Sequence, residues 1–137
     1  MKATSRRADS GTFIQRVEVR QHHVPVDEPT DHGGDDTAPS PQELLAASLA
    51  ACTAVTMEMY AKRKGWDLEG AEVDCEYSPA ESGQPTEFTL VLRFPNDLAP
   101  EQIERLSEIA GKCPVHRTLA GEVTFEQRTE LAESSVP

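Results

Sequence analysis

The stretch from Ser40 to Gly65 constrains the fold most, because it carries the signals that begin and end a long helix. Ser40, Pro41 and Glu43 suit the N-cap, N1 and N3 positions, which is the pattern of a capping box. Three basic residues end at Lys64, and Gly65 is the residue type that most often closes a helix. The sequence therefore predicts a helix that runs to Lys64 and is roughly 36 Å long at 1.5 Å per residue.

The first half of this helix has no polar face. From Leu44 to Val55 every residue is apolar or small, so this half should be buried on all sides. The chain has only 137 residues, 5% of them aromatic, and its core should be too thin to surround such a helix alone. We therefore predict an obligate homodimer in which the helices of two chains pack together.

The charge balance excludes several classes of partner. A formal net charge of −11, from 24 acidic and 13 basic residues, repels nucleic-acid phosphates and anionic lipids alike. No stretch approaches the roughly 18 consecutive apolar residues that span a bilayer, and the N-terminus leads into polar sequence rather than a signal-type segment. We expect a cytoplasmic protein with no nucleic-acid and no membrane partner.

The remaining patterns predict short strands and helices in an α+β fold. A long loop rich in acids and turn residues should span residues 27–39, and such loops are often functional. Residues 1–128 should form a single domain, and residues 129–137 a frayed tail. The expected elements are a hairpin around Phe13–Arg20 with Val17 and Val19 inward, a hairpin of Ala71–Tyr77 and Phe88–Phe94, helices from Pro100 to Gly111 and from Cys113 to Gly121, and a last strand at Val123–Phe125.

Three cysteines without a close pair do not form the disulfide framework of a small secreted domain. Cys75 alternates with acidic residues, which places it on the buried face of its strand and predicts an inert thiol. Cys52 lies mid-helix among alanines. It is either a small packing residue or a reactive thiol that needs a cationic neighbour, for which arginine is the most suitable type.

Cys113 has activating features of its own. Pro114 makes it the N-cap of a short helix, where free backbone N–H groups favour a thiolate. In the alternatives, Cys113 merely caps a turn, or it forms half of a zinc site with His116. Zinc would need two more ligands, and no second paired spacing exists, so we expect no metal ion. The remaining candidate ligands would be Cys52, Cys75, His22, His23 and His32.

Several segments, in order along the chain, closely resemble the OsmC/Ohr family of osmotically induced and organic-hydroperoxide-resistance proteins, most of all its OsmC-like branch. These segments are Val26–Pro29, Gly33-Gly34, Ser40–Thr53 with its Ala-Ala-Cys, Met59–Trp66, and Cys113-Pro-Val-His-Arg-Thr-Leu119. The resemblance implies an intertwined dimer in which each chain contributes a strongly bent antiparallel sheet, with the long Cys52 helices buried at the centre.

The resemblance also implies a mechanism that needs no cofactor. Cys52 would attack the O–O bond of an organic hydroperoxide as a thiolate and become a sulfenic acid. Cys113 would then condense with it to a disulfide, which a cellular dithiol reduces. The expected function is that of an antioxidant thiol peroxidase in the stress response, with peroxidatic Cys52 and resolving Cys113.

In the peroxidase members, a Glu near the start of the Cys helix and an Arg from the N-terminal hairpin set up the thiolate. Here the position of that Glu falls on Gln42, which lies roughly 80° from Cys52 around the helix. The neighbouring Glu43 lies roughly 180° away and points elsewhere. The arginine candidates are Arg16 and Arg20, with Arg117 as a third.

The neutral Gln42 can orient an arginine by a hydrogen bond but cannot hold it by charge. This departure favours an alternative, in which the protein senses redox state or binds a small apolar ligand and has weak or no peroxidase activity.

Overall fold

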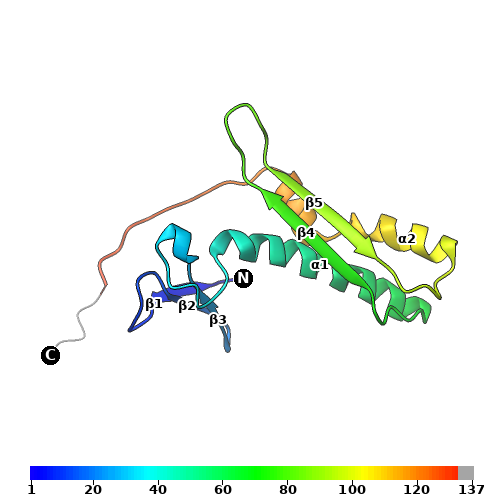
Figure 1. Ribbon diagram of the computed structural model, residues 1–137, viewed down its shortest axis with the longest axis horizontal. Coiled ribbons are helices and arrows are strands. Elements are labelled where there is room, and N and C mark those ends of the chain that lie inside the picture. The colour runs from blue at the N-terminus through cyan, green and yellow to red at the C-terminus, as the bar shows by residue number, and fades with distance from the viewer. Residues whose placement is uncertain (133–137) are drawn as a thin grey trace.

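The computed structural model describes residues 1–132. Its elements follow one another along an elongated molecule in which a three-stranded sheet lies at one end of a long helix (Figure 1). They are β1 (Thr4–Arg7), β2 (Gln15–Val19), β3 (His22–Val26), the short 3-10 helix η1 (Thr30–His32), α1 (Pro41–Lys64), β4 (Glu72–Ser78), β5 (Glu87–Arg93), α2 (Pro100–Ala110) and α3 (Pro114–Ala120).

The predicted long helix is confirmed as α1, and its capping box is complete. The Ser40 side chain accepts a hydrogen bond from the backbone N–H of Glu43 at 3.2 Å, and Glu43 Oε1 accepts one from the Ser40 N–H at 3.0 Å. Gly65 closes the helix with φ 73°, a left-handed conformation that glycine adopts without strain. Both ends of α1 are therefore fixed by local chemistry.

The hairpin predicted around Phe13–Arg20 is present and belongs to a larger sheet. β2 pairs antiparallel with both β1 and β3, and Val17 faces Val24 across the second pairing. β3 was not predicted, because two adjacent histidines and Pro25 make its sequence a poor strand candidate. β3 is tolerated because it lies at the edge of the sheet.

The second predicted hairpin is also confirmed. β4 and β5 pair antiparallel along their whole length, and both alternate between half-buried and exposed residues. The chain thus forms two separate sheets, whereas one strongly bent sheet was expected. In the described part of the single chain, no strand of β1–β3 pairs with β4 or β5.

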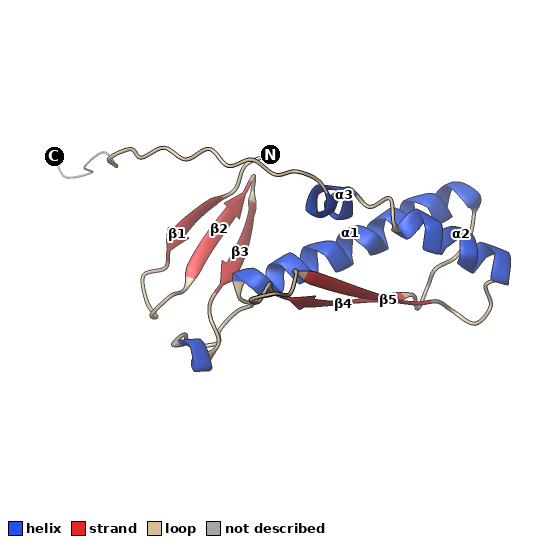
Figure 2. Cartoon of the chain, turned by 90° about the horizontal axis from the view of Figure 1, so that it is seen from above, coloured by secondary structure: helices blue, strands red, loops and turns tan. Residues whose placement is uncertain are grey.

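The core lies where the second half of α1 meets α2 and the loop after α1. It centres on Met57, Ala61, Leu68, Leu106 and Ala110, all of them buried. Partly buried side chains of the β4–β5 hairpin pack against it. Figure 2 shows α3 lying against the middle of α1, in agreement with the α1–α3 packing contacts.

The strand predicted at Val123–Phe125 is wrong. Residues 122–132 form no regular secondary structure, and Phe125 is 91% exposed. A strand needs a neighbour to hydrogen-bond with, and this segment has none within the described part of the chain. Residues 133–137 of the expected tail lie outside the described residues.

The prediction that the first half of α1 is buried on all sides concerns a dimer, and in the single chain part of this half stays open. Between Leu44 and Val55 only Leu49 and Thr53 are fully buried, because the β4–β5 hairpin and α3 do not cover the whole circumference. By length and composition alone, α1 would suffice to cross a membrane, a criterion that core helices of soluble proteins also meet. Here α1 packs against β4, α2 and α3, as a core helix does.

Candidate functional site

The fold brings Cys52 and Cys113 together. Cys52 lies mid-way along α1, and Cys113 is the N-cap of α3, which packs on α1. The two thiols interact, since each side chain shifts the pKa of the other. Cys113 is fully buried and Cys52 only partly, so Cys52 is the thiol that solvent and small molecules reach first.

The pKa of Cys113 is lowered. Burial alone would raise this pKa, but the side chain of Cys52 and the backbone N–H groups of His116 and Val115 together outweigh burial. These N–H groups belong to the first turn of α3, where backbone donors lack partners within the helix. The start of α3 therefore stabilises the Cys113 thiolate, as the sequence predicted.

The pKa of Cys52 is raised. Burial is the main cause, and the neighbouring Cys113 thiol adds to it, while the backbone N–H of Val115 and the side chain of Thr56 act in the opposite direction. None of these leading influences within the described chain is a guanidinium. Cys113 is therefore the more acidic thiol of the pair and Cys52 the less acidic one.

Sequence reasoning missed one polar residue beside the pair. Thr53 is fully buried next to Cys52, and its hydroxyl donates a hydrogen bond to the carbonyl oxygen of Leu49 at 2.8 Å. Its side chain also contributes to the lowered pKa of Cys113. The available signal was a hydroxyl side chain next to Cys52 in a mostly apolar helical run, because a buried hydroxyl needs a partner.

In the single chain, none of the three candidate arginines is among the groups that shift the pKa of Cys52. Arg16 Nε donates a hydrogen bond to His23 Nδ1 at 3.2 Å on the exposed face of the N-terminal sheet. Arg20 occupies the turn between β2 and β3 with φ 53° and is exposed. Arg117 is exposed on α3, one turn after Cys113.

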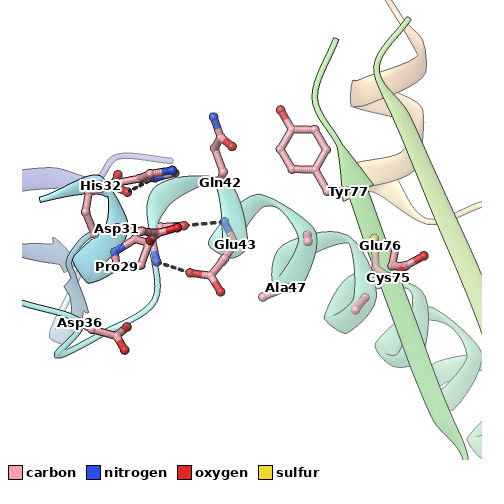
Figure 3. Close-up of a pocket in the computed structure, with 14 residues that line it drawn as sticks. Pro29, Asp31, His32, Asp36, Gln42, Glu43, Ala47, Cys75, Glu76 and Tyr77 are labelled. Carbon is pink, nitrogen blue, oxygen red and sulfur yellow. Dashed lines mark hydrogen bonds and ion pairs between the residues drawn. The ribbon is translucent and has the colours of Figure 1, made fainter. Parts of the chain in front are cut away.

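Gln42 is exposed at the start of α1, and ten residues separate it from Cys52. At 1.5 Å per residue this is about 15 Å along the helix axis, too far for direct contact. Figure 3 shows Gln42 projecting from the first turn of α1 on the side where Tyr77 of β4 also lies. The structure thus brings together the two cysteines, but neither Gln42 nor an N-terminal arginine joins them within one chain.

Gln42 and Tyr77 line a wide acidic cavity of about 920 Å³ between the N-terminal loop, α1 and β4 (Figure 3). Its carboxylates come from Glu28, Asp31, Asp36, Glu43 and Glu76. Cys75 faces α1 at the side of this cavity, and burial raises its pKa, which keeps the thiol protonated. Within residues 1–132, no group of three or more His, Cys, Asp or Glu side chains is arranged to hold a metal ion.

The loop beside this cavity is held by one buried carboxylate. Asp27 is 1% exposed and accepts hydrogen bonds from the Glu28 N–H at 2.7 Å, the Thr37 N–H at 3.0 Å and the Thr37 hydroxyl at 2.8 Å. These bonds lower the pKa of Asp27, and the Thr37 N–H is the largest cause of the shift. The predicted loop at residues 27–39 is therefore folded around an internal anchor.

The amino-acid sequence of the chain matches a known protein family. The sequence model of the family described as OsmC-like protein matches residues 33–128. No curated protein matches the chain.

Several solved structures share the fold. An OsmC-like protein from Mycoplasma pneumoniae is 18% identical with a TM-score of 0.70, and 88% of this chain and 86% of that chain are covered. The organic hydroperoxide resistance protein of Bacillus subtilis is 24% identical with a TM-score of 0.59, covering 88% and 90%. A proposed organic hydroperoxide resistance protein of Vibrio cholerae, with captopril bound in one of its active sites, is 20% identical with a TM-score of 0.62, covering 88% and 85%.

Proposed function

Because the chain belongs to the OsmC-like protein family, we propose that it is a thiol-dependent peroxidase that reduces organic hydroperoxides. The observation that carries the proposal is the contact between a partly exposed Cys52 and a buried Cys113 with a lowered pKa. Two relatives of the same fold are named as organic hydroperoxide resistance proteins, which supports the same substrate class.

The chemistry begins with a proton transfer. Cys113 as thiolate takes the proton of Cys52 across their contact, so Cys52 becomes the nucleophile at the moment of attack. The Cys52 thiolate then attacks the terminal oxygen of the hydroperoxide, the O–O bond breaks, and Cys52 becomes a sulfenic acid. The alkoxide that leaves takes the proton from Cys113 and departs as the alcohol, which restores the Cys113 thiolate.

The sulfenic acid is resolved to a disulfide through the same contact between Cys52 and Cys113. The Cys113 thiolate attacks the sulfur of the Cys52 sulfenic acid, the S–S bond forms, and the hydroxide that leaves takes a proton from solvent to become water. A cellular dithiol then reduces the disulfide by two successive exchanges and is itself oxidised to a disulfide. No cofactor is required, because the two thiols supply both electrons.

We further propose that the working form is a homodimer. One face of α1 remains open in the single chain, and its exposed residues recur every three or four positions, as in a helix that packs on another helix. These residues are Ala47, Ser48, Ala51, Val55 and Met59. Their small side chains at the N-terminal end allow two helices to approach closely. A partner chain is also the remaining source for Arg16 or Arg20 as the cation beside Cys52.

The test of the peroxidase is kinetic. Cys52→Ser should abolish consumption of cumene hydroperoxide in the presence of a dithiol, whereas Cys75→Ser, the matched control, should keep the rate of the parent. In Cys113→Ser the sulfenic acid should form more slowly, because the base that deprotonates Cys52 is lost, but it should then persist and be trapped by dimedone on Cys52. Consumption that is unchanged in Cys52→Ser contradicts the proposal.

A second function is favoured by the raised pKa of Cys52 and by Gln42 in place of the family's Glu. In this alternative, the protein is a slow redox sensor or a binder of small apolar molecules. Gln42→Glu separates the two functions, because a large gain in peroxide rate would show that the natural chain is not tuned for peroxidase activity. An unchanged or lower rate favours the peroxidase.

A further inference from the structure

We propose that the C-terminal end of α1 and the adjoining part of α2 form a binding site for a phosphate group, either free or as a monoester. Its residues are Tyr60, Arg63 and Lys64 of α1 and Arg105 of α2. They lie at the end of the molecule opposite the N-terminal sheet, where α2 runs beside α1 (Figure 1). The site does not depend on the peroxidase function, because it uses neither cysteine of the pair.

Three cationic groups gather round the ring of Tyr60. The guanidinium carbon of Arg105 lies 5.3 Å from the ring centroid and that of Arg63 5.8 Å, while Nζ of Lys64 lies 5.6 Å away. Arg63 and Lys64 follow Tyr60 by three and four positions, which places them on the same face of α1 as the ring. The ring attracts each cation, but the cations repel one another. A bound anion would relieve this repulsion.

Two of these cations have no counter-charge within the described part of the chain. Arg105 Nη1 forms an ion pair with Glu108 Oε2 at 2.8 Å. Within residues 1–132, neither Arg63 nor Lys64 forms an ion pair with a carboxylate. The negative end of the α1 dipole is equivalent to about half a charge, so it balances only part of their charge. The excess positive charge remains although the chain as a whole has a net charge of −11.

The hydroxyl of Tyr60 adds a hydrogen-bond donor to the two cations. Arg105 Nε donates a hydrogen bond to the hydroxyl oxygen at 3.0 Å, so the phenol is the acceptor in this contact and its own proton stays available. This hydrogen bond is the main cause that lowers the pKa of Tyr60, and the charges of Arg105, Lys64 and Arg63 add to it. A more acidic hydroxyl is a stronger donor to an anion.

The charge of the site selects the ligand. Arg63 and Lys64 carry one positive charge each, and a phosphate monoester carries about −1.5 to −2 at pH 7. Its three free oxygens can accept from the guanidinium, the ammonium and the phenol. A carboxylate carries a single charge and would leave one cation unbalanced. A long polyanion such as a nucleic acid would extend onto the acidic remainder of the chain and be repelled.

The fluorescence of Trp66 reports binding at this site. Trp66 is the single tryptophan of the chain, and its ring meets that of Tyr60 edge-on with centroids 5.7 Å apart. Inorganic phosphate and glycerol phosphate, each titrated at pH 7 and constant ionic strength, should change the emission saturably at millimolar concentrations. Acetate should bind at least about tenfold more weakly, because it carries less charge. The absence of a saturable change with both phosphates, or an equal affinity for acetate, overturns the proposal.

The double variant Arg63→Gln with Lys64→Gln removes the two unpaired cations. Both side chains are exposed, so the variant should fold, and its Kd for phosphate should rise at least about tenfold. The matched control is Lys2→Gln with Arg7→Gln, which removes two exposed cations, and the same total charge, in and beside β1. A control that weakens binding as much as the first double variant would reveal an effect of net charge alone and refute the site.

Tyr60→Phe tests the contribution of the hydroxyl. It keeps the aromatic ring and its contact with Trp66 but removes the O–H donor, so the Kd for phosphate should rise about tenfold. Cys52→Ser should bind phosphate as the parent does, which separates this site from the peroxidase. An affinity that is unchanged in Tyr60→Phe, or lost in Cys52→Ser, contradicts the site as proposed.

Discussion

Shortening Val55 and Met59 to alanine should dissociate the dimer without unfolding the chain. Both side chains lie on the open face of α1, with 49% of Val55 and 63% of Met59 exposed in the single chain. The packing that they contribute to one chain is therefore small. Their main contribution would come when a second copy of α1 covers them.

The size of the effect follows from these exposed fractions. Complete burial of a Val or Met side chain is worth about 1.5–3 kcal/mol, and truncation to alanine removes most of the part that dimerisation would bury. With about 1 kcal/mol for each side chain and four side chains in a symmetric dimer, the loss is about 3–4 kcal/mol. This corresponds to a dissociation constant that is two to three powers of ten higher, at about 1.4 kcal/mol per tenfold change.

Sedimentation equilibrium at several concentrations measures the change. The parent should be a dimer at micromolar concentration, and the double variant Val55→Ala with Met59→Ala should be largely monomeric there, with an unchanged circular dichroism spectrum. Val91→Ala is the matched control, because it truncates an equally exposed valine on β5 and should leave the dimer intact. A monomeric parent, or a double variant as dimeric as the parent, refutes the reasoning.

Two further predictions concern the elements that hold the loop and α1. Ser40→Ala removes the side-chain half of the capping box, so it should lower the free energy of unfolding by about 1 kcal/mol, as read from urea denaturation. Ser82→Ala, at an exposed position in the turn between β4 and β5, is the control, and an effect as small as the control's argues against the cap. The folded pKa of Asp27 is lowered from 3.8, so its contribution to stability is present above pH 3.8 and is lost as the pH falls through the lowered value. Asp27→Asn should therefore reduce the melting temperature at pH 7, and the difference from the parent should shrink toward pH 3; a difference that grows in acid contradicts the assigned sign.

The parts of the fold that local chemistry determines were predictable from sequence. The capping box at Ser40, the terminal Gly65 and the alternation in β4 and β5 each indicate an element through neighbouring residues, and the structure contains all of them. Cys113 at the start of α3 belongs to the same group, because Pro114 marks the first helical position.

The features that the sequence did not predict depend on distant partners. β3 forms because β2 offers an edge for pairing, although Pro25 and two histidines disfavour a strand. Val123–Phe125 has the pattern of a strand and lacks a neighbour in the single chain. Burial of the first half of α1 on all sides also depends on a second chain, because the sequence shows which faces are apolar but not which chain covers them.

The candidate site divides in the same way. The chemistry of each cysteine could be predicted from its neighbours in the sequence. The contact between the two cysteines could not, because it depends on the packing of α3 on α1. The hydroxyl of Thr53 beside the pair was overlooked, because the surrounding alanines suggest a purely apolar environment. The distance of Gln42 from Cys52 along α1 was calculable from the helix rise alone.

Disulfide mapping after peroxide treatment tests the central claim most directly. Reduced protein is mixed with one equivalent of cumene hydroperoxide, quenched with an alkylating reagent and digested for mass spectrometry. The account predicts a disulfide between Cys52 and Cys113 in nearly all chains, with Cys75 alkylated as a free thiol. Free Cys52 and Cys113 after this treatment, or a disulfide that involves Cys75 instead, would contradict the account.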